Sequence, residues 1–177
     1  PSLLAGLGML ALVHDLARRL WDRQVALYAG LLLLFSVQFT LQARSAQLDA
    51  LVSFWITLGL YGLIRHLLLG PSWGWYFIAW FAMGLGVITK RVGFLPVLLF
   101  LPWAVLRYRW PQQAPLPTGP VWRWWAGPIA MLAAIGLWLV PMLVHVALSG
   151  SPELAAYRDD ILLRQTAEPT RLSRRLQ

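Results

Sequence analysis

The chain has 177 residues, of which 59% are hydrophobic and 12% charged, and it contains eleven Trp residues. A composition this apolar is typical of a membrane protein rather than of a water-soluble domain. The formal net charge of +8 does not indicate a nucleic-acid partner, because the basic residues stand in short clusters at the ends of apolar runs, where membrane topology accounts for them. The absence of Cys excludes disulfides, thiolate metal sites and a thiol nucleophile.

Apolar runs separated by charged and turn residues predict an all-α fold, a polytopic transmembrane helix bundle of about six spans. The first run opens with Pro1 and has no basic region ahead of it, so we expect a helix truncated at its start, in a fragment of a longer protein, rather than a signal peptide. Two prolines in the fifth run are tolerable in a membrane helix that has packed neighbours. The runs cover residues 1–13, 24–42, 50–69, 73–89, 92–106 and 125–148.

The Lys and Arg residues between these runs predict which connections face the cytoplasm. One set of alternate connections holds seven arginines, whereas the other set holds only Arg44, Lys90 and Arg91 before the C-terminal segment. Because basic residues concentrate in cytoplasmic loops, the arginine-rich set is predicted to be cytoplasmic and the other set external. Trp residues at the same predicted cytoplasmic interface agree with this orientation. The arginines are Arg18, Arg19, Arg23, Arg65, Arg107, Arg109 and Arg123, and the Trp residues are Trp73, Trp75, Trp122, Trp124 and Trp125.

The composition changes to polar and charged residues near the C-terminal end of the chain. We therefore predict a transmembrane region over residues 1–150 and an external juxtamembrane segment over residues 151–177. Ser151, Pro152 and Glu153 are typical of a helix start, and the apolar residues that follow share one face. This pattern predicts an amphipathic helix on the outer membrane surface, ending at Pro169.

Lys90 and Arg91 are unusual because they stand side by side in a turn predicted to be external, where basic residues are infrequent. One interpretation is an anion site at the membrane surface: Arg binds phosphate oxygens through two parallel hydrogen bonds, and Lys supplies a compact charge. The other is a pair that only anchors the helix end among lipid headgroups. The residues alone leave both interpretations open.

Asp49 is the single acidic residue between Asp22 and Glu153, and it begins the third apolar run. It is interpreted either as the N-cap of that helix or as part of an outward-facing polar site with Arg44, Lys90 and Arg91. We predict that Arg44, Asp49 and Lys90 border one outward cavity.

The outer segment contains a third charged group, interpreted either as a solvated helix face or as part of an acceptor or outer site. His14, His66 and His145 lack the spacing of metal ligands, so no metal site is predicted; no cofactor is evident, and the sequence does not specify whether a divalent metal is needed. Gly59, Gly62, Gly84 and Gly86 are expected to allow close helix contacts. The members of the outer group are Tyr157, Arg158, Asp159, Asp160 and Arg164.

The chain resembles the inner-membrane glycosyltransferases of the GT-C class, in particular the bacterial lipid A aminoarabinose transferases and the protein O-mannosyltransferases. The resemblance rests on Ala43, Arg44, Asp49 and Ala50, on the stretch "ITK" at residues 88–90, on the order of the intervening helices and on "YRDDILLRQTAE" in the outer segment. It covers nearly the whole chain to about residue 168.

The resemblance implies an enzyme that transfers a hexose or pentose from a polyprenyl-phosphate donor to a hydroxyl of a lipid, glycan or protein. It places such an enzyme in the bacterial inner membrane, among membrane lipids, with its active face periplasmic or extracellular. Lys90 matches the family's lysine and takes the donor-phosphate role, with Arg91 and Arg44 beside it, although Arg91 stands where glycine is common. Asp49 matches an acid that shapes the site, whereas the principal base is expected upstream of residue 1, so that the fragment alone would be inactive.

Two other functions are compatible with the same residues. A lipid-phosphate-binding transporter or flippase would use the outer basic residues without transferring sugar, and in a noncatalytic membrane scaffold the charges would only anchor helices. An inverted second copy of these helices would favour the transporter, and an acidic outer loop upstream would favour the enzyme.

Overall fold

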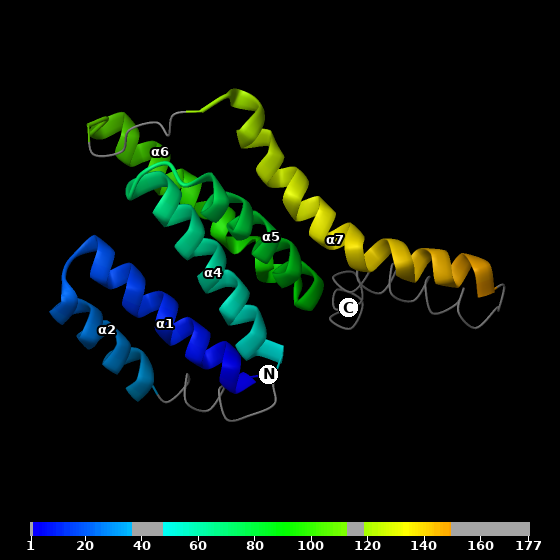
Figure 1. Cartoon of the computed structure of the whole chain (residues 1–177), viewed down its shortest axis with the longest axis horizontal. Helices are drawn as coiled ribbons and strands as arrows, with labels where there is room; N and C mark the ends of the chain where they lie inside the picture. Colours follow the sequence, from blue (N-terminus) through cyan, green and yellow to red (C-terminus); the bar gives the residue numbers. More distant parts are fainter. Residues whose placement is uncertain (1, 37–47, 113–118, 150–177) are drawn as a thin grey trace, which may run out of the picture. The chain divides into compact units, whose positions relative to one another are not determined.

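The computed structural model describes residues 2–36, 48–112 and 119–149 of the chain. All regular secondary structure in these ranges is helical (Figure 1). The elements are α1 (Ser2–Leu20), α2 (Arg23–Phe35), α4 (Leu48–Leu68), α5 (Trp73–Thr89), the 3-10 helix η1 (Arg91–Leu99), α6 (Phe100–Arg109) and α7 (Val121–Ser149).

Three helical stretches in the described ranges are long and apolar enough to cross a membrane, namely Asp49–Leu68, Arg91–Arg109 and Val121–His145. Arg23–Phe35 and Trp73–Thr89 are shorter apolar helices. These stretches overlap five of the predicted runs and confirm the all-α fold with helices long enough to cross a membrane, whereas the number of about six spans stays a prediction. The predicted outer amphipathic helix lies outside the described residues.

The chain divides into two compact units, Pro1–Ile135 and Gly136–Gln177. Helix α7 begins in the first unit and continues into the second. The predicted boundary near residue 150 coincides with the end of the described residues and stays a prediction.

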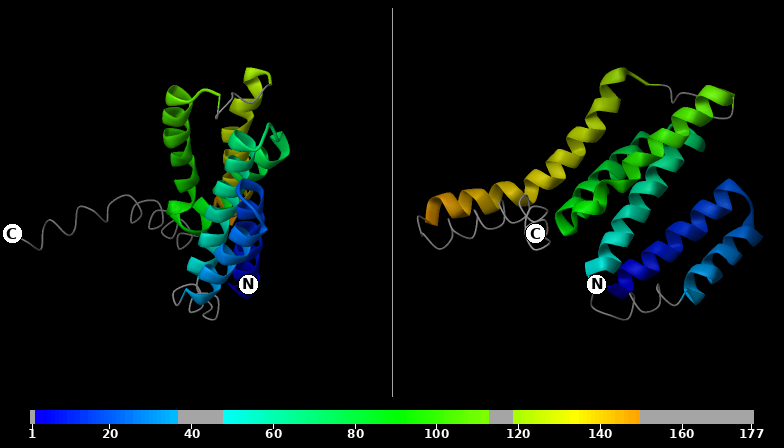
Figure 2. Two further views of the ribbon diagram at one scale, coloured as in Figure 1. Left: turned by 90° about the vertical axis from the view of Figure 1, so that its left-hand side faces the viewer. Right: turned by 180° about the vertical axis from the view of Figure 1, so that it is seen from behind.

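Within the first unit, successive helical stretches run in opposite directions, with η1 and α6 together forming one continuous stretch (Figures 1 and 2). Helix α1 contacts α2 and α4, α4 contacts α5 and η1, and η1 contacts α5 and α6. The turn between α4 and α5 contains Gly70 with φ of 115°, a conformation that residues with a Cβ rarely adopt. The resulting alternation brings the N-terminal end of α4 next to the C-terminal end of α5.

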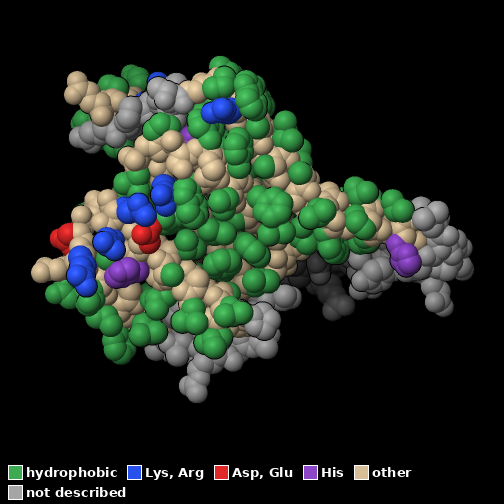
Figure 3. Space-filling view, viewed as in Figure 1, with side chains coloured by type: hydrophobic (Ala, Val, Ile, Leu, Met, Phe, Trp, Pro, Cys, Tyr) green, Lys and Arg blue, Asp and Glu red, His purple; other side chains and the backbone are tan. Residues whose placement is uncertain are grey.

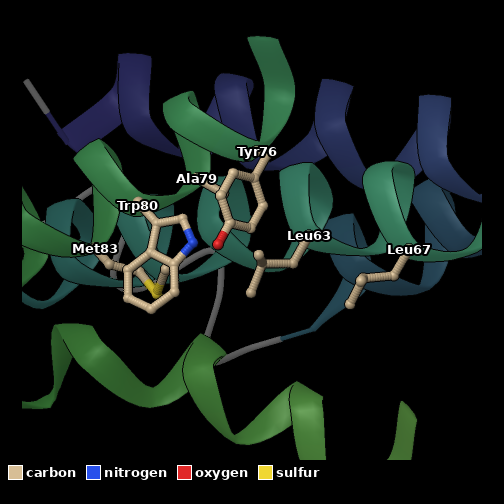
Figure 4. Packing of buried hydrophobic residues seen from close by; sticks show 6 residues of the cluster. All are labelled: Leu63, Leu67, Tyr76, Ala79, Trp80 and Met83. Atoms are coloured by element: carbon tan, nitrogen blue, oxygen red, sulfur yellow. The ribbon is translucent and has the colours of Figure 1, made fainter. Parts of the chain in front are cut away.

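The core of this unit lies between α4 and α5, where Leu63, Tyr76 and Met83 are fully buried (Figure 4). Gly62 allows the two helices to approach closely, because a Cβ there would lie 2.5 Å from the carbonyl oxygen of Trp75 and 2.8 Å from the Cβ of Ala79. Close van der Waals packing of this kind stabilises helix contacts in lipid, where the hydrophobic effect between helices is absent. Similar near contacts at Gly59, Gly84 and Gly86 confirm the role predicted for these glycines.

Arginines of the predicted cytoplasmic set lie over aromatic rings at one end of the unit. The guanidinium carbon of Arg65 is 4.9 Å from the ring centre of Trp75, and that of Arg107 is 5.7 Å from the ring centre of Trp103. Arg123 lies 5.6 Å from the rings of both Trp73 and Trp122. Cation–π contacts and interfacial Trp residues are consistent with a membrane boundary at this end.

The fifth predicted run is not one regular α-helix. Residues Arg91–Leu99 form a 3-10 helix that contains Pro96, and α-helical geometry begins only at Phe100. Pro96 has no N–H to donate, and the tight packing at Gly93 described below constrains the same stretch. The sequence predicted that a helix would tolerate the two prolines, but it did not predict the long 3-10 helix.

Candidate functional site

Lys90 connects α5 to η1. Its backbone is extended, with φ of −157° and ψ of 132°. Its N–H donates to the carbonyl of Gly86 at 2.8 Å, which closes α5, and its own carbonyl accepts from the N–H of Gly93 at 3.0 Å, which begins η1. Both backbone groups of Lys90 are therefore bonded, and the turn fixes the point from which its side chain projects.

Two glycines hold this turn closed. A Cβ added to Gly93 would lie 2.5 Å from the Cα of Gly86, and closer still to the Gly86 carbonyl carbon and the Val87 nitrogen. A Cβ added to Gly86 would lie 2.9 Å from the Cα of Gly93. Because the obstructing atoms are backbone, only glycine fits at residue 93 without moving η1 away from α5.

Asp49 lies opposite Lys90, in the first turn of α4. The Lys90 ammonium donates to the Asp49 carboxylate, with Nζ 2.6 Å from Oδ1. The N-cap interpretation of Asp49 is wrong, because the preceding residue, Leu48, is already helical. An acid in the first turn is still favoured by the helix dipole, so the position stabilises the carboxylate while its side chain reaches across to Lys90.

The ion pair is accessible and energetically weak. The Lys90 side chain is 56% exposed and that of Asp49 46% exposed. Ion pairs with this exposure contribute about 0–1 kcal/mol. An incoming anion can therefore displace the Asp49 carboxylate, or share the Lys90 ammonium group with it, at little cost in free energy. The pair therefore orients the ammonium group without burying it.

The other predicted site residues differ in what the structure says of them. Arg91 is exposed and is the first residue of η1, beside the Lys90 turn. Arg44 and the whole outer group of residues 157–164 lie outside the described residues. The structure thus brings Asp49 and Lys90 together, whereas the predicted shared cavity with Arg44 stays a prediction.

A polar network at the opposite, arginine-rich end was not predicted from the sequence. Tyr61 donates to Asp15 at 2.5 Å and accepts from the Arg65 guanidinium at 2.9 Å, which joins α1 to α4. Arg19 donates to the same Asp15 oxygen at 2.6 Å. This hydrogen bond is the largest cause of the lowered pKa of the Asp15 carboxyl, which lies below its ordinary value of 3.8. The i,i+4 spacing of Asp15 and Arg19 was the signal available in the sequence.

In the described ranges no cluster of three or more His, Asp or Glu side chains is placed to hold a metal ion. The described side chains at the Lys90 turn present fixed charges: an ammonium group bonded to a carboxylate, with a guanidinium next to it in sequence. Such charges have the chemistry that phosphate and other anionic groups require of a binding site.

Comparison with known proteins gives two curated relatives in Pseudomonas fluorescens. Undecaprenyl phosphate-alpha-4-amino-4-deoxy-L-arabinose arabinosyl transferase 1 of strain Pf-5 is 38% identical over 107 residues, which are 55% of this chain and 19% of that protein. Transferase 2 of the same name, from strain Pf0-1, is 34% identical over 128 residues, which are 68% of this chain and 22% of that protein. The chain spans about a fifth of the length of these relatives. No solved structure matches the chain.

A family model described as dolichyl-phosphate-mannose-protein mannosyltransferase matches residues 2–148, most of the chain. The matched range includes both Asp49 and Lys90. This match and the two relatives confirm the resemblance to GT-C glycosyltransferases that the sequence predicted. The chain belongs to the dolichyl-phosphate-mannose-protein mannosyltransferase family.

Proposed function

We propose that the chain is part of a membrane glycosyltransferase that transfers a sugar from a polyprenyl-phosphate donor to a hydroxyl group on the non-cytoplasmic side of a bacterial inner membrane. Family membership supports the class of reaction, and the names of the two relatives support an undecaprenyl-phosphate-linked sugar as the class of donor. The observation that carries the proposal is the Lys90–Asp49 ion pair at the end of α5 and the start of α4.

The position of this pair fits a lipid-linked phosphate. Lys90 follows the last residue of an apolar helix, at the end of the helices that is poor in arginine. A polyprenyl chain lies in the hydrocarbon region and its phosphate at the surface, which is the depth at which a helix end places a charged side chain. The donor therefore meets the ammonium group without leaving the membrane.

The reaction increases the negative charge next to Lys90. The bond between the anomeric carbon and the phosphate oxygen breaks, and its electron pair remains on the polyprenyl phosphate. The acceptor oxygen forms the new bond to the anomeric carbon and gives its proton to a base. Because a phosphodiester becomes a phosphomonoester, a fixed cation stabilises the transition state and the product more than the donor.

The proposal gives Asp49 a positioning role. Its carboxylate is already paired with Lys90, so we assign the base that accepts the acceptor's proton to another acid, upstream of residue 1. Arg91 and Arg44 are assigned to the donor phosphate, and the outer group of Tyr157, Arg158, Asp159, Asp160 and Arg164 to the acceptor side. These assignments follow the family resemblance.

The test is binding of polyprenyl phosphate to the full-length protein in nanodiscs. Lys90→Ala should weaken binding by about tenfold, which is about 1.4 kcal/mol, and Lys90→Arg should keep most of it. Arg109→Ala removes an exposed arginine at the opposite end and is the matched control. If Lys90→Ala binds as tightly as the control, the phosphate role is refuted.

A second comparison separates positioning from direct binding. If Asp49 acts only through Lys90, Asp49→Asn should weaken binding in the wild-type background and have little effect when Lys90 is already Ala, because residues in contact are non-additive. Additive effects would assign Asp49 an independent contact. Tight binding without sugar transfer, but with movement of the lipid between leaflets, would favour the flippase instead.

A further inference from the structure

A groove of about 340 Å³ lies between α1 and α2, away from the Lys90 turn. Its walls are almost entirely apolar, and most of the side chains that form them are half exposed. The groove remains unfilled because small residues, Ala11 on α1 and Gly30 on α2, stand among the larger ones. The larger side chains that line the groove include Leu7 and His14 on α1 and Leu27, Leu31 and Leu34 on α2.

Both walls of the groove continue into an arginine at the same end. On α1, the stripe of Leu7, Ala11 and His14 reaches Arg18 at helical spacings of three and four residues. On α2, Arg23 precedes Leu27 by four residues in the same way. Figure 3 shows Lys and Arg side chains gathered near the connected ends of α1 and α2, with hydrophobic side chains below them in the view.

The two arginines are available to an anion. Arg18 and Arg23 are exposed, and neither forms an ion pair within the part of the chain that the structure describes. The acids nearby have other partners: Asp22 accepts from the N–H of Val25 at 2.7 Å as the N-cap of α2, and Asp15 pairs with Arg19. The groove thus ends in two cations that no described carboxylate neutralises.

The length of the groove matches one leaflet of a bilayer. Leu7 and Arg18 are eleven positions apart on α1, and Arg23 and Leu34 are eleven positions apart on α2. At about 1.5 Å per residue this is about 16 Å, close to half of the roughly 30 Å hydrocarbon thickness. Trp21, which is 68% exposed in the turn between the helices, marks the arginine end as the headgroup level.

We propose that this groove binds an anionic glycerophospholipid of the predicted cytoplasmic leaflet, with the headgroup phosphate at Arg18 and Arg23 and one acyl chain between α1 and α2. His14 joins the two helices just below the arginines, where its Nδ1 donates to the carbonyl of Ala26 at 3.1 Å. A lipid combines the two chemistries that the groove presents, an anionic group at the surface and an apolar chain one leaflet long.

The experiment places photoreactive p-benzoylphenylalanine at Leu31, which is 41% exposed in the groove, in the full-length protein. The control places it at Leu101, an apolar α6 residue that is 66% exposed. Both proteins are illuminated in nanodiscs of phosphatidylcholine with a minor share of phosphatidylglycerol, and mass spectrometry identifies the adducts. We expect phosphatidylglycerol at Leu31 to exceed its share of the bilayer by about twenty-five-fold, since each of the two arginines contributes a factor of roughly five. At Leu101 the adducts should follow the bilayer composition.

Variants separate the headgroup contacts from the groove. Arg18→Gln combined with Arg23→Gln should abolish the enrichment, whereas Arg109→Gln, an exposed arginine on α6, should leave it unchanged. Gly30→Leu should fill the groove and reduce retention of phosphatidylglycerol in native mass spectrometry, because a Cβ there meets only Leu10 and His14 at 3.7 Å and 3.9 Å. Adducts that follow the bilayer composition at Leu31, adducts to a protein segment, or unchanged retention in Gly30→Leu would each overturn the proposal.

Discussion

Replacing Gly93 by Ala tests whether the packing of two backbones holds the Lys90 turn in place. The new Cβ would lie 2.5 Å from the Cα of Gly86, where real Cβ atoms essentially never approach, and its nearest obstructions are backbone atoms that cannot rotate away. The overpacked helix must move, at a cost of about 1–3 kcal/mol. We expect the upper part of this range, because no flexible side chain absorbs the shift.

The assay is the unfolding free energy of the full-length protein in mixed micelles, followed by denaturant or heat. Gly86→Ala should cost less, since its Cβ would meet the Cα of Gly93 at 2.9 Å and the Cβ of Trp55 at 3.3 Å. Gly74→Ala is the control, because no atom lies within 4 Å of a Cβ there and alanine favours a helix by about 1 kcal/mol over glycine. If Gly93→Ala is as stable as Gly74→Ala, η1 does not pack against α5 as described.

Three further predictions concern the arginine-rich end. Tyr61→Phe removes the hydroxyl that links Asp15 to Arg65 and should lower the unfolding free energy by about 1 kcal/mol in denaturant titrations, while an unchanged value would exclude the link. Folding lowers the pKa of Asp15, so its contribution to stability is complete only well above its ordinary value of 3.8 and is lost as the pH falls through that value to the lowered pKa of the folded protein. Asp15→Asn should therefore flatten the acid limb of the stability curve, and an identical limb would refute this. His66→Ala should cost about 2–5 kcal/mol in the same titrations, because His66 is 0% exposed among aromatic rings and accepts from the N–H of Ser72 at 3.1 Å; a cost near zero would contradict its burial.

The sequence predicted most of the helices, because charges and turn residues bound the apolar runs. Helix α1 continues to Leu20, past the predicted end of its run at residue 13, because its last turns carry Asp15, Arg18 and Arg19. The positions of Asp49 and Lys90, one at the start of a helix and one at the end of the next, suffice to predict that they lie at the same end of an antiparallel pair. Their direct contact required the structure, because it depends on the distance between α4 and α5 that Gly62 and the other glycines set.

Other features left little trace in the sequence. The 3-10 geometry of Arg91–Leu99 arises from the contact of Gly93 with Gly86 together with Pro96, and no local pattern distinguishes it from an apolar α-helix. The link from Tyr61 to Asp15 joins residues 46 positions apart, so it could not be predicted from spacing within one helix. The N-cap interpretation of Asp49 failed because α4 already includes Leu48.

The central claim is that Lys90 stabilises the departing lipid phosphate, and single-turnover sugar transfer by the full-length protein with saturating polyprenyl-phosphate donor tests it most directly. Removing one group that stabilises developing negative charge costs about a hundredfold or more in rate. We therefore expect Lys90→Ala to reduce the transfer rate by about a hundredfold, Lys90→Arg to restore part of it and Arg109→Ala to have no effect. A Lys90→Ala protein that is folded, saturated with donor and as fast as the wild type would contradict the claim.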